Sequence, residues 1–278
     1  MFKINVLNYM ISFVLIVLLK TLIVFFKGVF MFKPNILPEW EIKPTDEMLT
    51  EYLIAVESGM DPMIALDTET TGLDTNVDVA LFASIAWGWD SPFAKRFLLT
   101  ADHLVDKGFH DWITSVDQQV CFANASYDLH ILYNSGIPEL KGEIHDVIVM
   151  CHLCDENRVR SGRGLSIKNQ APDYLGINMV SFQEYFGLKE KESGVALLSQ
   201  PIEKVAHYAT LDAWVTLGLY HQHKKTLLEI PLPGNYFSFK NLFEYYDYIE
   251  KPLIKTLFCM EKRGVKLDVR KLKDLLIY

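Results

Sequence analysis

The sequence predicts an α/β domain in which helices cover a central sheet. Between residues 62 and 136, short strand-like apolar runs alternate with helical segments. From residue 145 onward the spacing of apolar residues becomes helical. Half of the 278 residues are apolar, so the chain can bury a sizeable core. Strands first, with helices interleaved and then dominant, are typical of a sheet packed between helices.

In the first half of the chain, apolar spacing and end signals define each element. Residues 45–58 begin with the capping residues Thr45 and Asp46 and have apolar positions three to four apart, which predicts a helix. Gly136 is a typical helix stop. The other expected elements are strands at 62–66, 81–89, 94–99 and 118–123, and helices at 102–116 and 127–136.

The second half is predicted to be helical. Gly, Pro and Asn residues separate its segments. The expected helices are 146–156, 164–175, 181–186, 201–229 and 237–263. A last helix is expected to start at Asp268, a good N-cap, and no stop signal follows it. We therefore expect the chain to be a fragment of a longer protein.

The net charge of −8 conceals a strongly acidic middle. Residues 31–250 carry 16 basic and 32 acidic side chains, whereas residues 251–278 carry eight basic and three acidic ones. Such a middle is not a nonspecific nucleic-acid clamp, although metal ions would allow it to act on nucleic acid.

Cysteine usage indicates a reducing compartment, and a cytoplasmic location is expected. The four cysteines are too few and too scattered for a disulfide framework. The stretch "CHLC" (151–154) has zinc or redox spacing, but no second CxxC exists. Packed helix thiols are therefore the preferred interpretation of Cys151 and Cys154.

The N-terminal stretch "NYMISFVLIVLLKTLIVFFKGVF" (8–30) is almost wholly apolar, with Lys20 in its middle. About 20 apolar residues span a bilayer, and a central lysine makes spanning costly. Three interpretations stay open: a membrane anchor, an uncleaved signal-like segment, or a dispensable extension before Met31.

Two carboxylates follow a buried strand in the stretch "ALDTETTGLD" (65–74). Residues i and i+2 of a strand face the same side, so Asp67 and Glu69 are expected to point together. Paired carboxylates repel each other unless a cation lies between them. The alternative is a solvated strand end before a turn.

Two further stretches add polar residues at element junctions. "FANASYDLHIL" (122–132) places Asn124 and Asp128 where a strand meets a helix, and the alternative role of Asp128 is to stabilise the helix dipole. "HYATLDAWVTLGLY" (207–220) places Tyr208 and Asp212 on one helix face, four residues apart. The alternative there is a core helix with an incidental aspartate.

Taken together, the three stretches resemble the exonuclease motifs of DnaQ-like 3′–5′ exonucleases, and most of all the proofreading domain of family A DNA polymerases. The motifs DxE, NxxxD and YxxxD correspond to residues 67–69, 124–128 and 208–212. Residues 145–176 and 250–268 also resemble this family, the latter at the entry to its polymerase domain. The resemblance implies an RNase H-like exonuclease fold, with a mixed sheet flanked by helices and a helical C-terminal extension.

The resemblance also implies a site and a chemistry. Two Mg²⁺ or Mn²⁺ ions would be held by four carboxylates and would activate water and stabilise the leaving 3′ oxygen. Asp67 would bridge both ions, Glu69 and Asp212 would serve the water-activating ion, and Asp128 would reach the other. Leu73, with a core position as its alternative, would wedge against the terminal base, and Asn124 and Tyr127 would contact the terminal nucleotide.

The stretch "HYATLD" leaves the water-orienting residue open between His207 and Tyr208. Branches of the superfamily use a histidine five residues, or a tyrosine four residues, before the last aspartate. Adjacent residues diverge by about 100° on a helix, so only one of the two can face the metals. A helix that begins near Pro201, with Glu203 in its first turn, favours Tyr208 as a catalytic residue.

The expected function is metal-dependent removal of nucleotides from single-stranded DNA 3′ ends or frayed primer termini. Polymerase activity is not expected from this chain, and a separate polymerase portion is a candidate partner. The alternatives are a related exoribonuclease and a membrane-tethered, non-catalytic binding module. The expected domains are 1–30 (apolar segment), 31–60 (linker and helix), 61–230 (exonuclease) and 231–278 (start of a truncated polymerase domain).

Overall fold

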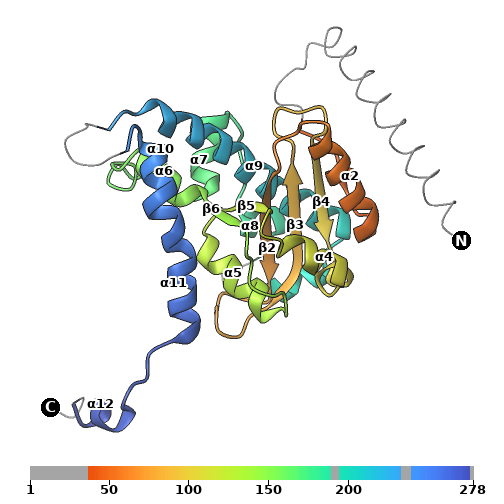
Figure 1. The fold of residues 1–278 in the computed structure, drawn as a ribbon. Helices are drawn as coiled ribbons and strands as arrows, with labels where there is room; N and C mark the ends of the chain where they lie inside the picture. The colour runs from red at the N-terminus through yellow and green to blue at the C-terminus, as the bar shows by residue number, and fades with distance from the viewer. Residues whose placement is uncertain (1–36, 189–193, 233–238, 276–278) are drawn as a thin grey trace, which may run out of the picture.

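A mixed sheet forms the centre of the protein (Figure 1). The computed structural model describes residues 37–188, 194–232 and 239–275, and in these the sheet has six strands in the order β1-β4-β3-β2-β5-β6. Central β2 pairs antiparallel with β3 and parallel with β5. The strands are β1 (Trp40–Glu41), β2 (Met63–Thr70), β3 (Ala80–Trp87), β4 (Lys95–Leu99), β5 (Gln119–Phe122) and β6 (Glu143–Asp146).

Helices pack on both faces of this sheet, which confirms the expected α/β class. On one face, α2, α3, α4, α5 and α11 contribute to one apolar core, and on the other, α6, α7 and α9 contribute to a second. The helices are α2 (Thr45–Glu57), α3 (Ala101–Leu104), α4 (Lys107–Ile113), α5 (Ala125–Asn134), α6 (Val147–Cys154), α7 (Ile167–Leu175), α8 (Phe182–Phe186), α9 (Ile202–Glu229), α10 (Leu242–Tyr245), α11 (Lys251–Arg263) and α12 (Val269–Leu275), with a 3₁₀ turn at Gly194–Ser199 and a π-helical turn at Tyr246–Glu250.

The alternation of side chains along β2 assigns its residues to the two faces. Ile64 and Leu66 lie in the core with α2 and α5, whereas Met63 and Ala65 lie in the core with α9. Because side chains alternate with a period of two, the odd-numbered residues that follow continue on the α9 face. The strand therefore directs its later odd residues toward α9 and its even residues toward α5.

Helix α9 is the longest described helix and crosses the central strands. It begins at Ile202 after Pro201 and carries Glu203 in its first turn, as expected from the sequence. The Ser84 hydroxyl of β3 donates to the Ala209 carbonyl at 2.8 Å, which joins the helix to the sheet. At Gly218 a β-carbon would lie 2.5 Å from the Trp89 ring, so the absence of a side chain permits this close approach.

Several elements differ from the sequence-based expectations. The strand predicted at 62–66 extends to Thr70, because its pairing with β3 continues through a bulge at 69/70. The helix predicted at 102–116 is divided, since Asp106 caps a new helix by accepting from the Phe109 amide. The short strands β1 and β6 were not predicted. β6 precedes the apolar start of α6 directly, so the assignment of helix from residue 145 was wrong there.

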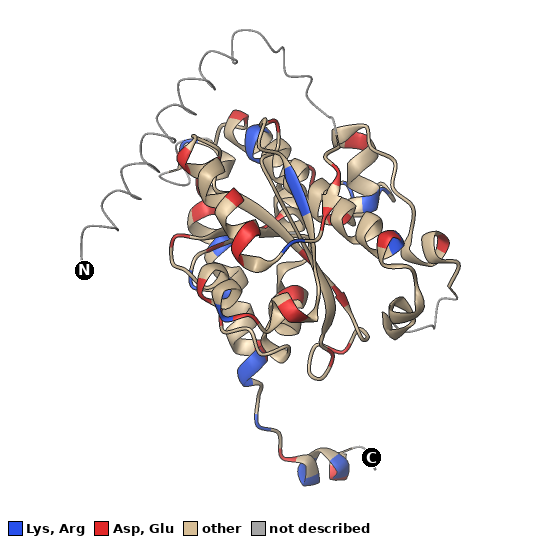
Figure 2. Ribbon diagram, turned by 90° about the vertical axis from the view of Figure 1, so that its right-hand side faces the viewer, with Lys and Arg blue, Asp and Glu red and all other residues tan. Residues whose placement is uncertain are grey.

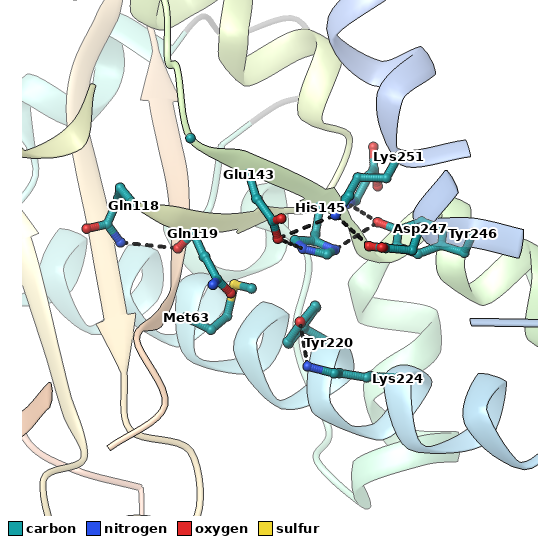
Figure 3. A network of polar contacts seen from close by, with 12 residues as sticks. Met63, Gln118, Gln119, Glu143, His145, Tyr220, Lys224, Tyr246, Asp247 and Lys251 are labelled. Carbon is teal, nitrogen blue, oxygen red and sulfur yellow. Dashed lines mark hydrogen bonds and ion pairs between the residues drawn. The ribbon is translucent and has the colours of Figure 1, made fainter. Parts of the chain in front are cut away.

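The C-terminal extension packs against the outer strand β6. The Tyr246 hydroxyl accepts from the Asp146 amide at 3.2 Å and lies 3.3 Å from His145 Nδ1, and Lys251 pairs with Glu143 (Figure 3). Burial, with the nearby Lys251 and Lys224, lowers the pKa of His145 to about 3, so the imidazole is neutral. The predicted helix 237–263 is thus interrupted by a π-helical turn at this contact.

Beyond this contact, α11 packs along β6 and α5, and a short segment leads from its end to α12 (Figure 1). Ile254 and Phe258 are buried with α5, and Asp268 caps α12 by accepting from the Arg270 and Lys271 amides, as expected. Lysine and arginine gather on α12, while acidic residues are spread over the rest of the ribbon (Figure 2). The apolar segment 8–30 lies outside the described residues, and no described helix is long and apolar enough to cross a bilayer.

Candidate active site

Three carboxylates meet between β2 and α9. Asp67 and Glu69 are odd-numbered residues of β2 and so face α9, from which Asp212 projects. Ligand oxygens of the three residues all lie within 4.8 Å of one another. In the described part of the chain this is the single group of three or more His, Cys, Asp or Glu side chains with such spacing. The DxE motif and the last aspartate, 145 positions apart, thus form one cluster.

The three carboxylates carry more negative charge than the neighbouring Lys168 ammonium can neutralise. Glu69 and Asp212 are 9% and 6% exposed. Burial raises the pKa of Glu69 to about 8, and it also raises that of Asp67, with the charges of Asp128, Asp212 and Glu69 adding to the effect. Asp212 Oδ1 is buried without a hydrogen-bond partner. Such an oxygen is a ready ligand for a cation.

Asp128 lies beside the cluster and is held by β2. It is 3% exposed, and its Oδ1 accepts from the Thr68 amide at 3.1 Å and the Thr68 hydroxyl at 2.7 Å. Burial raises its pKa to about 7, while the bonds from Thr68 oppose this shift. Thr68 is an even residue of β2, so Asp128 approaches from the α5 side of the strand. Its charge still raises the pKa of Asp67, although it is not within the 4.8 Å group.

Asp146 positions the start of α5 and was not identified from the sequence. Its carboxylate accepts from the amides of Asn124 at 3.3 Å and Ala125 at 2.8 Å. Asn124 has φ +76°, a left-handed conformation that asparagine adopts more readily than most other non-glycine residues. The Tyr246 contact to the Asp146 amide therefore links the C-terminal extension to the helix that carries Asp128.

The two water-orienting candidates face different surroundings. Tyr208 is 6% exposed, and burial with the charges of Asp212, Glu69 and Asp67 raises its pKa. His207 is exposed, stacks on the Tyr185 ring and lies 3.1 Å from its hydroxyl. The helical divergence of adjacent residues thus turns Tyr208, and not His207, toward the carboxylates.

The residues expected to contact a terminal nucleotide lie around the end of β2. Leu73 is 87% exposed, so it is not a core residue. The Tyr127 hydroxyl donates to the Gly72 carbonyl and lies 2.7 Å from the Thr70 hydroxyl, which fixes the loop before Leu73. Asn124 and Tyr127 line an open hollow of about 410 Å³. Its lining residues are Thr75, Asn76, Asn124, Ser126, Tyr127, His130 and Glu261.

Two residues that the sequence analysis did not select approach these groups. Lys168 of α7 pairs with Asp212 at 3.0 Å. Glu261 of α11 accepts from Ser126 at 2.6 Å and lies 3.1 Å from His130 Nε2. No motif signals either residue, because each contact depends on how a later helix packs. By contrast, Cys151 and Cys154 of "CHLC" are free thiols on α6 and do not belong to the carboxylate group, in line with the preferred interpretation as packed helix thiols.

Comparison with known proteins identifies the family. A family profile described as 3′–5′ exonuclease, of the DNA polymerase A type, matches residues 42–228. The chain belongs to this 3′–5′ exonuclease family. It is accordingly a nuclease that hydrolyses phosphodiester bonds. The expected relationship to the exonuclease region of family A polymerases is confirmed.

Curated relatives of this exonuclease chain are much longer DNA polymerases. DNA polymerase I of Synechocystis sp. is 25% identical over 220 residues, which cover 76% of this chain and 20% of that protein. DNA polymerase I B, chloroplastic/mitochondrial, of Arabidopsis thaliana is 29% identical over 242 residues, which cover 73% of this chain and 23% of that protein. The exonuclease chain spans about a fifth of the length of the curated relatives it matches.

Solved structures confirm the RNase H-like fold. The POL domain of Pol1 from M. smegmatis has a TM-score of 0.60 at 14% identity, over 85% of this chain and 34% of that one. Escherichia coli RNase D, an exoribonuclease, has a TM-score of 0.52 at 15% identity, over 82% of this chain and 52% of that one. At these identities the likeness concerns the fold alone.

Proposed function

We propose that this exonuclease chain removes nucleotides from the 3′ ends of single-stranded DNA by two-metal-ion hydrolysis. The observation that carries the proposal is the group formed by Asp67, Glu69 and Asp212, with a buried, unpartnered Asp212 oxygen. Unpaired buried carboxylates are costly in a fold unless a cation compensates them. Carboxylate oxygens are the ligands that Mg²⁺ and Mn²⁺ prefer.

The donor set fits hard divalent cations. Asp67, Glu69 and Asp212 would hold one ion, and Asp128 with Asp67 would hold a second, with Asp128 still bonded to Thr68. Ions bound there supply Lewis-acid chemistry, by which water is activated and the departing 3′ oxygen is stabilised. No nucleophilic side chain is required.

The chain's own residues would orient the reactants. The Tyr208 hydroxyl stays protonated at neutral pH, since its pKa is raised, and it can therefore donate a hydrogen bond to the attacking water or a phosphate oxygen. Leu73 would stack on the terminal base from its exposed position, and Asn124 and Tyr127 would contact the terminal nucleotide beside the hollow.

Single-stranded DNA is the favoured substrate because the matched relatives carry the name DNA polymerase. A mismatched primer terminus frays more easily than a paired one, so it reaches such a site at lower cost. In the same proposal, the segment from residue 231 onward leads to a polymerase portion, and this portion is the candidate partner. The second candidate, an exoribonuclease, is favoured only by the fold likeness to RNase D.

The test of this function uses 5′-labelled DNA and RNA strands of matched sequence. With Mg²⁺ we expect a ladder that shortens from the 3′ end, more quickly on DNA, and no products in EDTA. Release of labelled mononucleotide from the 5′ end, or products in EDTA, would contradict the mechanism. Faster degradation of RNA would replace DNA by RNA as the substrate.

Substitution of Tyr208 by phenylalanine tests the orienting hydroxyl. We expect kcat on single-stranded DNA to fall about a hundredfold, because the variant removes one hydrogen-bond donor and keeps the ring. The neighbouring His207→Ala should retain kcat within about threefold, since His207 faces Tyr185. Single-turnover rates measure both, and a larger loss in His207→Ala would reverse the assignment.

A further inference from the structure

Lys168 brings a positive charge to the carboxylate cluster. Its ammonium pairs with Asp212 Oδ2 at 3.0 Å and lies 5.1 Å from the centre of the Tyr208 ring. Its charge also acts on Asp67 and Glu69, whose pKa values it lowers against the effect of burial. The lysine therefore contacts Asp212 and Tyr208 directly and acts on Asp67 and Glu69 through its charge.

The position of this lysine is unfavourable for its own helix. Lys168 lies in the first turn of α7, which begins at Ile167, and a positive charge near a helix N-terminus is opposed by the helix dipole. A residue that breaks a local rule requires compensation from elsewhere in the fold. The compensation here is the carboxylate cluster, which offers more negative charge than one ammonium neutralises.

Neighbouring residues hold α7 firmly in place. The fully buried Arg158 donates to the Gly164 and Asn169 carbonyls and pairs with Asp173 at 2.9 Å. On the other side, the Gln170 side chain lies 2.7 Å from His223 of α9. The backbone that carries Lys168 is thus attached to α9, while its side chain remains 26% exposed and has a route to solvent.

We propose that Lys168 is a resident counter-ion of the carboxylate cluster, which holds an Asp212 oxygen in the metal-free protein and releases it when a divalent cation binds. The inference rests on the proposed metal site. The lysine and the cation would both be attracted to the Asp212 carboxylate and would repel each other, so the lysine stabilises the metal-free fold and weakens metal affinity. Lys168 is therefore not a metal ligand. It is a positioning residue that acts through the ligand Asp212.

The test is calorimetric titration of Mn²⁺ into the protein without DNA. Lys168→Met removes the competing charge, so we expect Mn²⁺ to bind at least about tenfold tighter, given the size of charge interactions over a few ångströms. Lys168→Arg should stay within about threefold of the parent. Lys204→Met is the matched control, because Lys204 lies over the Tyr185 and Phe186 rings and does not pair with the cluster.

The outcomes separate this inference from the function on which it rests. If the parent binds no Mn²⁺, the proposed metal site fails. If the parent binds Mn²⁺ and Lys168→Met binds it no more tightly, the counter-ion role alone is overturned. Metal-free Lys168→Met should also melt at a lower temperature than the parent and recover with Mn²⁺.

A measurement on the unmodified protein covers the case in which the variant does not fold. In nuclear magnetic resonance spectra, the side-chain ammonium signal of Lys168 should shift when Mg²⁺ is added, whereas that of Lys204 should not. An unchanged Lys168 signal at a Mg²⁺ concentration that saturates the site would overturn the proposal.

Discussion

Replacement of Asp67 and Glu69 together by alanine is expected to reduce exonuclease activity by at least about a thousandfold, the size of loss expected when metal-ion catalysis is removed. Two of the three clustered carboxylates disappear in this variant, and Asp212 and Asp128 alone cannot hold two divalent ions. The measurement is the initial rate on a 5′-labelled single strand with Mg²⁺.

Stability separates this loss of activity from a loss of folding. Removal of two mutually repelling, buried carboxylates should leave the metal-free protein at least as stable as the parent. Asp102→Ala with Asp111→Ala is a matched control, because both are exposed and lie on the helices of the opposite face. We expect parental activity in the control. Residual activity above about a tenth in the Asp67, Glu69 variant would exclude the metal mechanism.

The metal-free protein is expected to lose stability as the pH rises from about 5 to about 8. The folded-state pKa of Glu69 is about 8 and that of Asp128 about 7, both above their ordinary values. In this window the unfolded chain has released protons that the folded chain still binds, so each pH unit favours unfolding. The contribution of these two carboxyl groups to the free energy of unfolding is fully present below about pH 4. It is lost as the pH rises through their folded-state pKa values. The loss is a few kcal/mol.

Divalent cations should reverse this dependence. Bound ions favour ionised ligands, so saturating Mn²⁺ is expected to make the protein more stable at pH 8 than at pH 5.5. Denaturant unfolding in EDTA and in Mn²⁺, at both pH values, measures the two slopes. In the Asp67, Glu69 double variant both the decrease with pH and the Mn²⁺ effect should shrink. A metal-free parent whose stability rises across this window would contradict the assigned carboxylate environment.

The sheet core and the long helices follow from apolar spacing, and α2, β3, β4, α5 and α9 lie close to their predicted positions. The short strands escaped prediction because their residues carry too little pattern. Glu143–Asp146, for example, has four residues and merges with the apolar start of α6. This segment is a strand because it pairs in parallel with β5. That pairing depends on the tertiary arrangement and not on the local sequence pattern.

By itself the sequence determined which side chains share a face. Strand alternation sets Asp67 beside Glu69, and helical spacing sets Tyr208 with Asp212, since both periods arise from backbone geometry within one element. Only the tertiary structure decided how these elements meet. The contacts in question are the hydrogen bond between Thr68 and Asp128, the bond from the first amide of α5 to Asp146, and the ion pair of Lys168 with Asp212. These contacts depend on the packing of distant segments, which no local period encodes.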